Sequence, residues 1–250
     1  MSSPSVRDLE LTPESSEEIL YPDSDGQPMA DNTLQFRWIV TIQENLEIIF
    51  ALDEAVFVAG DLLWYPVEGN NKLRQAPDVM VVFGRSKGDR GSYQQWKEDN
   101  IPPQVVFEIL SPGNRPGRMA EKSLFYQRYG VEEYYIYDPH QQELSGLQQF
   151  EKWLEPIEEI QGWVSPRLGI RFELMDTGLE IYRPDGQKFL TFVELDQLRQ
   201  QESQRADQAE LELQQESQRA NQAELELQQE RQRTERLAEL LRAQGIDPEE

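Results

Sequence analysis

The chain has 250 residues, of which 38% are hydrophobic and 10% aromatic, enough for one domain with a packed core and an appendage. Its net charge of −23 argues against a protein that binds nucleic acid over a broad basic surface. It has no cysteine, which excludes disulfides, thiol nucleophiles and cysteine-ligated zinc. It also lacks an apolar run of membrane-spanning length and a basic, apolar leader, so we expect a cytoplasmic protein.

Composition and pattern divide the chain into three parts. Residues 1–32 are rich in Ser, Pro, Asp and Glu and poor in large apolar side chains. Such a segment buries too little surface to offset the entropy lost on ordering, so we predict that it is mostly disordered. The folded domain is expected over residues 33–192 and a helical tail over residues 193–250.

The domain begins with apolar residues at helical spacing from Thr33, with Asp31 or Asn32 as a cap, which predicts an amphipathic helix packed on a sheet. A second helix is expected from Pro116 to Tyr129, ended by Gly130. Runs rich in Val, Ile, Phe and Tyr predict strands at 57–66, 78–84, 105–110 and 133–139, with hairpins over 146–183. Strands on both sides of a helix favour an α/β fold with a mixed sheet.

Three ionisable side chains lie on successive predicted elements. Asp78 heads one strand, Glu108 interrupts the apolar run of the next, and Lys122 lies in the helix that follows. Burying a charge is costly unless the group is paired or binds a metal. Glu108 is therefore either a solvent-facing or ion-paired strand residue, or part of a site. Asp61, after Gly60, is either a turn residue or a further site carboxylate.

The loop from Gly84 to Asn100 combines glycines, aromatic residues and four basic residues. Three of these, Arg85, Lys87 and Arg90, could contact phosphates and unstacked bases. A solvated loop has the same composition, so both interpretations stay open. Residues 71–140 carry ten basic and nine acidic side chains, which makes this the part of the chain that is not acidic.

Four segments in this region together resemble one bacterial family: Pro77-Asp78-Val79, EILSP from Glu108, Glu121-Lys122, and YGVEEY at 129–134. They resemble the Uma-two family of restriction endonucleases, a branch of the PD-(D/E)XK nuclease superfamily, over roughly residues 33–175. The resemblance implies a restriction-endonuclease-like α/β fold. It also implies hydrolysis of DNA phosphodiester bonds with Mg²⁺ or Mn²⁺.

The resemblance further implies that Asp78, Glu108 and the Ile109 carbonyl hold the ion. The superfamily pattern has a lysine where this chain has Leu110, so the resemblance implies that Lys122 supplies the amine. Superfamily nucleases often carry a further acidic residue on the first helix, and here this would be Glu44 or Glu47. We favour a solvated helix face as the explanation for these two glutamates. A catalytically silent nucleic-acid binder and a protein-interaction module remain the alternatives.

The tail contains a 14-residue repeat, at 200–213, 214–227 and, degenerately, 228–241. The period equals two heptads, and the residues are strong helix formers. One register aligns eight apolar side chains: Ala206, Ala209, Leu213, Ala220, Ala223, Leu227, Leu237 and Leu241. Because Glu202, Glu216 and Glu230 interrupt this seam, we predict a weak coiled coil that makes a homodimer or larger assembly. The alternative is a lone charged helix.

Overall fold

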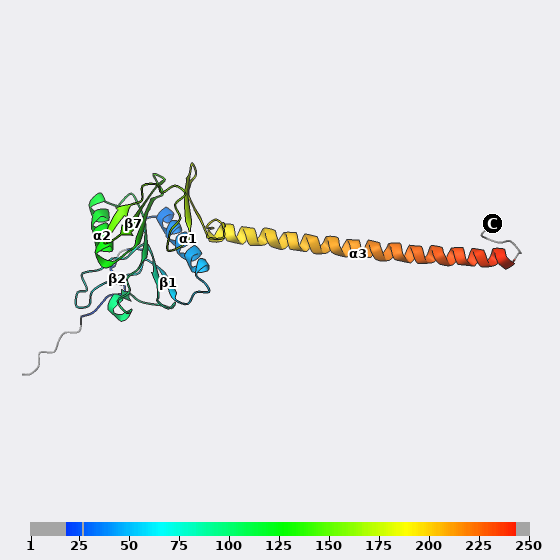
Figure 1. Cartoon of the computed structure of the whole chain (residues 1–250), viewed down its shortest axis with the longest axis horizontal. Coiled ribbons are helices and arrows are strands. Elements are labelled where there is room, and N and C mark those ends of the chain that lie inside the picture. The colour runs from blue at the N-terminus through cyan, green and yellow to red at the C-terminus, as the bar shows by residue number, and fades with distance from the viewer. Residues whose placement is uncertain (1–18, 27, 244–250) are drawn as a thin grey trace, which may run out of the picture. The chain divides into compact units, whose positions relative to one another are not determined.

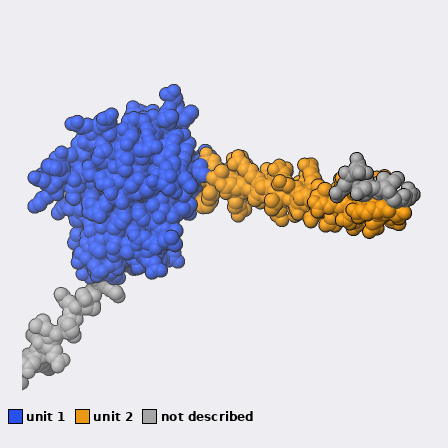
Figure 2. Space-filling model, turned by 45° about the vertical axis from the view of Figure 1, so that its right-hand side comes forward, with its two compact units in different colours: residues 1–190 blue, residues 191–250 orange. Residues whose placement is uncertain are grey.

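The computed structural model describes residues 19–26 and 28–243 of the chain. These divide into two compact units, residues 1–190 and residues 191–250 (Figure 2). Unit 1 is a mixed α/β domain, and unit 2 consists of one helix in its described part (Figure 1). None of the described helices has the length and apolar character needed to cross a membrane.

A six-stranded mixed sheet forms the centre of unit 1. Its strands, in spatial order, are β1 (Val56–Gly60), β3 (Val79–Phe83), β5 (Val105–Ile109), β6 (Glu133–Asp138), β7 (Glu143–Phe150) and β8 (Trp153–Pro156). Neighbouring strands pair antiparallel except β5 and β6, which are parallel. Helix α2 (Pro116–Tyr129) makes the connection between these two strands, as parallel neighbours require.

Each face of the sheet has its own apolar cluster. Helix α1 (Thr33–Ile49) and the two-stranded sheet of β9 (Arg171–Met175) and β10 (Gly178–Tyr182) cover one face. Helix α2 and the short parallel pair β2 (Trp64–Tyr65) and β4 (Tyr93–Gln94) cover the other. A 3-10 turn, η1 (Gln95–Lys97), follows β4. Because both faces are covered, most residues of the central strands are apolar, and a charged residue on them stands out.

Two predicted elements differ from the structure. The run at 57–66 is split into β1 and β2, because Asp61 adopts a left-handed backbone with φ 47° that ends the first strand. The hairpins at 146–183 only partly complete the main sheet, since β9 and β10 form a sheet of their own.

An N-terminal strap, defined here as residues 20–26 and 28–31, lies against unit 1 without regular secondary structure. The Tyr21 hydroxyl accepts a hydrogen bond from the Gly69 N–H at 2.6 Å, and the Tyr65 hydroxyl donates to the Pro22 carbonyl at 2.7 Å. The Tyr21 ring also packs on Trp96. The strap therefore contacts the domain where the sequence predicted disorder. Residues 1–18 and 27 of that segment lie outside the described residues.

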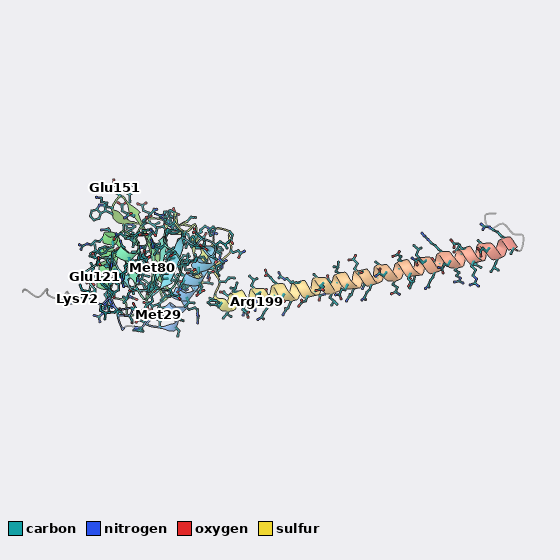
Figure 3. All side chains as sticks on the ribbon, turned by 90° about the horizontal axis from the view of Figure 1, so that it is seen from below. Met29, Lys72, Met80, Glu121, Glu151 and Arg199 are labelled. Carbon is teal, nitrogen blue, oxygen red and sulfur yellow. The ribbon has the colours of Figure 1, made fainter. Side chains whose placement is uncertain are left out.

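Helix α3 (Phe192–Ala243) is 52 residues long and contains the repeat. Apart from Ala238, every side chain described in α3 is exposed, and Figure 3 shows side chains extending both above and below the helix. A soluble helix that is exposed all round is stabilised by intrahelical pairs or by a partner that covers one side.

Candidate active site

Asp78 lies where the antiparallel ladder between β3 and β5 ends. The last paired residues are Val79 and Phe107, so Asp78 immediately precedes the ladder. Its Oδ2 accepts a hydrogen bond of 2.6 Å from the main-chain N–H of Ile109, and the residue is only 7% exposed. This side-chain hydrogen bond replaces the main-chain pairing between β3 and β5, which ends at Val79 and Phe107. It fixes the Asp78 carboxylate beside the end of β5.

Glu108 lies inside β5 and is buried, with 2% of its surface exposed. Its neighbours Phe107 and Ile109 belong to the cluster beneath α1, so the alternation of the strand directs Glu108 toward α2. Two side chains of α2 bond to its carboxylate. Lys122 Nζ lies 2.6 Å from Oε2, and the Tyr126 hydroxyl donates to Oε1 at 2.5 Å. Glu108 is therefore a buried, fully bonded carboxylate.

The short connection after β5 explains how α2 reaches Glu108. In the turn from Ser111 to Arg115, the Asn114 side chain accepts a hydrogen bond of 2.5 Å from the Ser111 N–H. Pro116 then occupies the first position of the helix, where its missing N–H costs nothing. Lys122 and Tyr126 are four residues apart and share one helix face, so both meet the same carboxylate.

Tyr126 was not predicted as a site residue. A tyrosine on the apolar face of a helix resembles an ordinary core residue, and Tyr126 is indeed fully buried among aromatic side chains. The signal that could have identified it is its spacing of four residues from Lys122. Its hydroxyl satisfies an oxygen of Glu108 that would otherwise be buried without a partner, which would be costly.

Three ionisable groups of the site have raised pKa values. Burial, together with the nearby charge of Glu108, raises the pKa of Asp78 to about 8. Burial, then the charge of Asp25, raises the pKa of Asp61 to about 6. Burial lowers the pKa of Lys122, but the charges of Glu108 and Asp78 outweigh it, so that this pKa is raised and the amine is an ammonium. At neutral pH in the ion-free protein, Asp78 is therefore largely protonated, whereas Lys122 carries its charge.

A pocket of about 170 Å³ opens beside these residues. The side chains in its wall include Asp78, Lys122, Asp61, Gln35 and Arg118. Residues of the N-terminal strap close one side of it. A small polar pocket of this kind, with convergent charged groups of shifted pKa, has the character of a functional site.

A family model described as "Putative restriction endonuclease", that of the Uma2 family, matches residues 24–174, more than half of the chain. The chain belongs to the Uma2 family. The match contains Asp78, Glu108 and Lys122 and ends in β9, so it leaves out α3.

Among solved structures, the Uma2 chain is similar to a "putative nuclease belonging to DUF820" from Anabaena variabilis. The two share 16% sequence identity, with a TM-score of 0.41 over 56% of this chain and 74% of that chain. No curated protein matches the chain.

Helix α1 of the Uma2 chain contributes a residue that was not predicted. Gln35 is 7% exposed, lines the pocket and donates from Nε2 to the Ile109 carbonyl at 2.8 Å. Neither Glu44 nor Glu47 is among the described residues that line the pocket, and Glu47 instead pairs with Lys87 at 3.0 Å. The sequence showed that α1 is amphipathic, but it did not show which polar residue faces the end of β5.

The three basic loop residues of the Uma2 chain are bonded within the domain. Arg85 and Arg90 both pair with Glu98, at 2.8 and 2.7 Å, and Lys87 pairs with Glu47. Arg90 also lies over the Phe57 ring, 4.0 Å from its centroid. These contacts favour a structural role for the loop cations, because a phosphate would have to compete with carboxylates that are already in place.

The pocket's donor set suits a hard divalent cation. Asp78 and Asp61 offer carboxylate oxygens on the pocket wall, and Glu108 lies behind Lys122, to which it is bonded. Among the described residues, no three His, Cys, Asp or Glu side chains are grouped closely enough to hold a metal. An ion would therefore need a main-chain carbonyl and water as well, which is the coordination that Mg²⁺ favours.

Proposed function

We propose that this Uma2 chain is an endonuclease that hydrolyses DNA phosphodiester bonds with Mg²⁺ or Mn²⁺. The observation that carries the proposal is the contact of 2.6 Å between Lys122 Nζ and Glu108 Oε2, beside Asp78 and the pocket. The three residues come from a helix and from the ends of two neighbouring strands, as the family resemblance requires. The family match supports a nuclease.

Asp78, Glu108 and the Ile109 carbonyl would hold the ion. When bound, a divalent cation lowers the pKa of an attacking water and polarises a phosphate oxygen. The protein's own part is to orient the oxygen ligands in advance. The Ile109 N–H fixes Asp78, and Tyr126 fixes the second oxygen of Glu108.

Lys122 acts in this proposal as an electrostatic group. Because the charges of Glu108 and Asp78 raise its pKa, it is protonated at neutral pH and does not serve as a general base. Its ammonium can donate hydrogen bonds to the negative charge that develops on the phosphate oxygens. Removing one such donor typically slows an enzyme by about 10²- to 10³-fold.

The start of α2 is the best candidate for positioning the DNA backbone. Arg115 and Arg118 are exposed in and beside the first turn, and Arg118 lines the pocket. Arginine contacts to phosphates fix the register of a duplex without reading its sequence. The positive end of the helix dipole favours an anion at the same place.

A catalytically silent nucleic-acid binder on the same scaffold is the second candidate. The observation that favours it is that both oxygens of Glu108 are already bonded to protein groups, so that an ion must compete with Lys122. Such a protein would bind DNA without cutting it.

The test is a cleavage assay on supercoiled plasmid and on single-stranded DNA, with Mg²⁺, with Mn²⁺ and with chelator. We expect the wild type to cut with either ion, and both chelator and Asp78→Ala to abolish cutting. An intact substrate after prolonged incubation, with DNA binding retained, would favour the silent binder. Cleavage that persists in Asp78→Ala would place the catalytic site elsewhere.

A further inference from the structure

We infer that Gln35, on the pocket wall, is a positioning residue that fixes the direction of the Ile109 carbonyl beside Asp78, and that ion binding depends on it. This inference rests on the proposed function, because it takes the Ile109 carbonyl as an ion ligand. Gln35 does not itself carry charge or react. Its effect comes through the direction in which it holds a main-chain oxygen.

The orientation of the Gln35 amide is set by both of its partners. Its Oε1 accepts a hydrogen bond of 2.8 Å from the Asp31 N–H, and its Nε2 donates to the Ile109 carbonyl at 2.8 Å. If the amide oxygen and nitrogen were exchanged, the amide NH₂ would face the Asp31 N–H and the amide oxygen would face the Ile109 carbonyl. Neither hydrogen bond could then form. The side chain therefore joins the N-terminal strap to the end of β5 in one orientation.

The Ile109 carbonyl needs this donor because the neighbouring strand cannot supply one. Val79 pairs with Phe107, and continuing that register places Pro77 opposite Ile109. Proline has no N–H to donate to the ladder. Side chains instead bond both main-chain groups of Ile109, since Asp78 accepts from its N–H and Gln35 donates to its carbonyl.

The two bonds hold Ile109 between the carboxylate and the amide. The carbonyl keeps a second lone pair, because a main-chain oxygen has two. Without the Gln35 bond, the peptide unit of this carbonyl would be held only through the Leu110 N–H, which donates to the Tyr137 carbonyl at 2.8 Å, so the carbonyl could tilt away from Asp78. Side chains that orient the ligands of a metal typically change its affinity by about 10- to 100-fold when they are replaced.

The chain contains a matched control at the other end of β5. Gln104 is 8% exposed, accepts a hydrogen bond of 2.8 Å from the Phe83 N–H and donates to the Phe83 carbonyl at 3.4 Å. It thus bridges main-chain groups as Gln35 does, with nearly equal burial. It is not among the described residues that line the pocket.

The experiment measures the dissociation constant of Mn²⁺ by isothermal titration calorimetry on the full chain. Wild type is compared with Gln35→Met and Gln104→Met, which keep side-chain length but remove the amide. We expect Gln35→Met to weaken Mn²⁺ binding by tenfold or more and Gln104→Met to leave it within about twofold of wild type. Thermal unfolding of both variants measures their loss of stability. In Gln35→Asn, the side chain is too short to reach both Asp31 and Ile109, so this variant should weaken Mn²⁺ binding as Gln35→Met does. It replaces Gln35→Met in the experiment if Gln35→Met fails to fold.

Unchanged Mn²⁺ affinity in Gln35→Met or Gln35→Asn would overturn the inference and leave the nuclease proposal standing. Equal weakening in Gln35→Met and Gln104→Met would also overturn it, because the effect would then reflect general loss of stability. A wild-type protein that binds no Mn²⁺ would overturn both the inference and the proposed function.

Discussion

Asp78 and Glu108 are both buried carboxylates, but they differ in how their charge is compensated. Glu108 receives a hydrogen bond or ion pair on each oxygen from α2. Asp78 receives a main-chain N–H on Oδ2, and burial with the Glu108 charge still raises its pKa to about 8. The burial of Asp78, on the wall of the pocket, is therefore only partly compensated by its hydrogen bond.

This incomplete compensation predicts that Asp78→Asn stabilises the ion-free protein. The folded-state pKa lies above the ordinary value of 3.8, so the native state binds more protons than the unfolded state between about pH 4 and pH 8. The wild type thus loses stability as the pH rises through that window. Asp78→Asn escapes this loss and should gain up to about 5 kcal/mol at pH 8 and about 2 kcal/mol at pH 5.

Urea unfolding with chelator, at both pH values, measures this gain. Asp89→Asn, on the exposed loop, is the control and should change little. A variant at Asp78 that is less stable than wild type at pH 8 would contradict this electrostatic account.

Lys122→Met should have the opposite effect on stability. It leaves Glu108 buried without its ion-pair partner, and removing one member of a buried pair typically costs about 3–5 kcal/mol. The same change should slow cleavage by about 10²- to 10³-fold. Mn²⁺ affinity should not fall, because the ammonium no longer competes for Glu108. Calorimetry measures the Mn²⁺ affinity, and a cleavage assay measures the rate. A lower Mn²⁺ affinity with an unchanged cleavage rate would contradict the role assigned to Lys122.

At the scale of elements, helix α2 depends on how it begins and ends. It starts with Pro116 and ends at Gly130, whose left-handed backbone has φ 93°. A methyl group on Gly130 would lie 3.2 Å from Pro102 Cγ, whereas one on Gly117 would meet nothing within 4 Å. A side chain would therefore be crowded at Gly130 but not at Gly117.

We predict opposite signs for two glycine substitutions. Gly130→Ala should destabilise the protein by about 1 kcal/mol or more, because alanine is strained at positive φ and crowds Pro102. Gly117→Ala should stabilise it by about 0.5–1 kcal/mol, since it lowers the entropy of the unfolded chain. Chemical denaturation of the two variants measures both changes in stability. Equal changes would show that the end of α2 is not constrained by its backbone.

Much of the fold around the site could be predicted from the sequence, because the signals for strands and for helix ends lie in short stretches of the chain. The apolar runs predicted β3, β5 and β6, and Pro116 with Gly130 predicted the bounds of α2. The rest depends on partners distant in sequence. Gln35 meets Ile109 across 74 residues, and Lys87 meets Glu47 across 40. Neither contact has a signature in a single sequence, so Glu44 and Glu47 were considered for the site and Gln35 was not.

At the scale of the whole molecule, α3 presents apolar side chains without a covering element. Leu213 and Leu227, on the predicted seam, are 68% and 50% exposed. Leu211 and Leu225 lie off the seam and are 48% and 55% exposed. At 52 residues and 1.5 Å per residue, the helix is about 78 Å long, and self-association along the seam would cover one side of it.

Self-association through the seam predicts different results for matched pairs of leucines. Changing Leu213 and Leu227 to Glu should dissociate the assembly, whereas the same changes at Leu211 and Leu225 should not. Truncation after Leu190 should give a monomer that retains the fold of unit 1. Light scattering at tens of micromolar measures the mass, and a full-length chain that is already monomeric would contradict the prediction.

The most direct measurement is the rate of plasmid nicking by Glu108→Gln compared with Glu133→Gln. Glu133, on the neighbouring strand β6, is also buried, but it bonds to Ser165 and Tyr135, whereas Glu108 bonds to Lys122, which lines the pocket. With Mg²⁺ or Mn²⁺, we predict that Glu108→Gln abolishes nicking and that folded Glu133→Gln retains it. Nicking that survives in Glu108→Gln, or that is lost equally in both variants, would contradict a catalytic site at Asp78, Glu108 and Lys122.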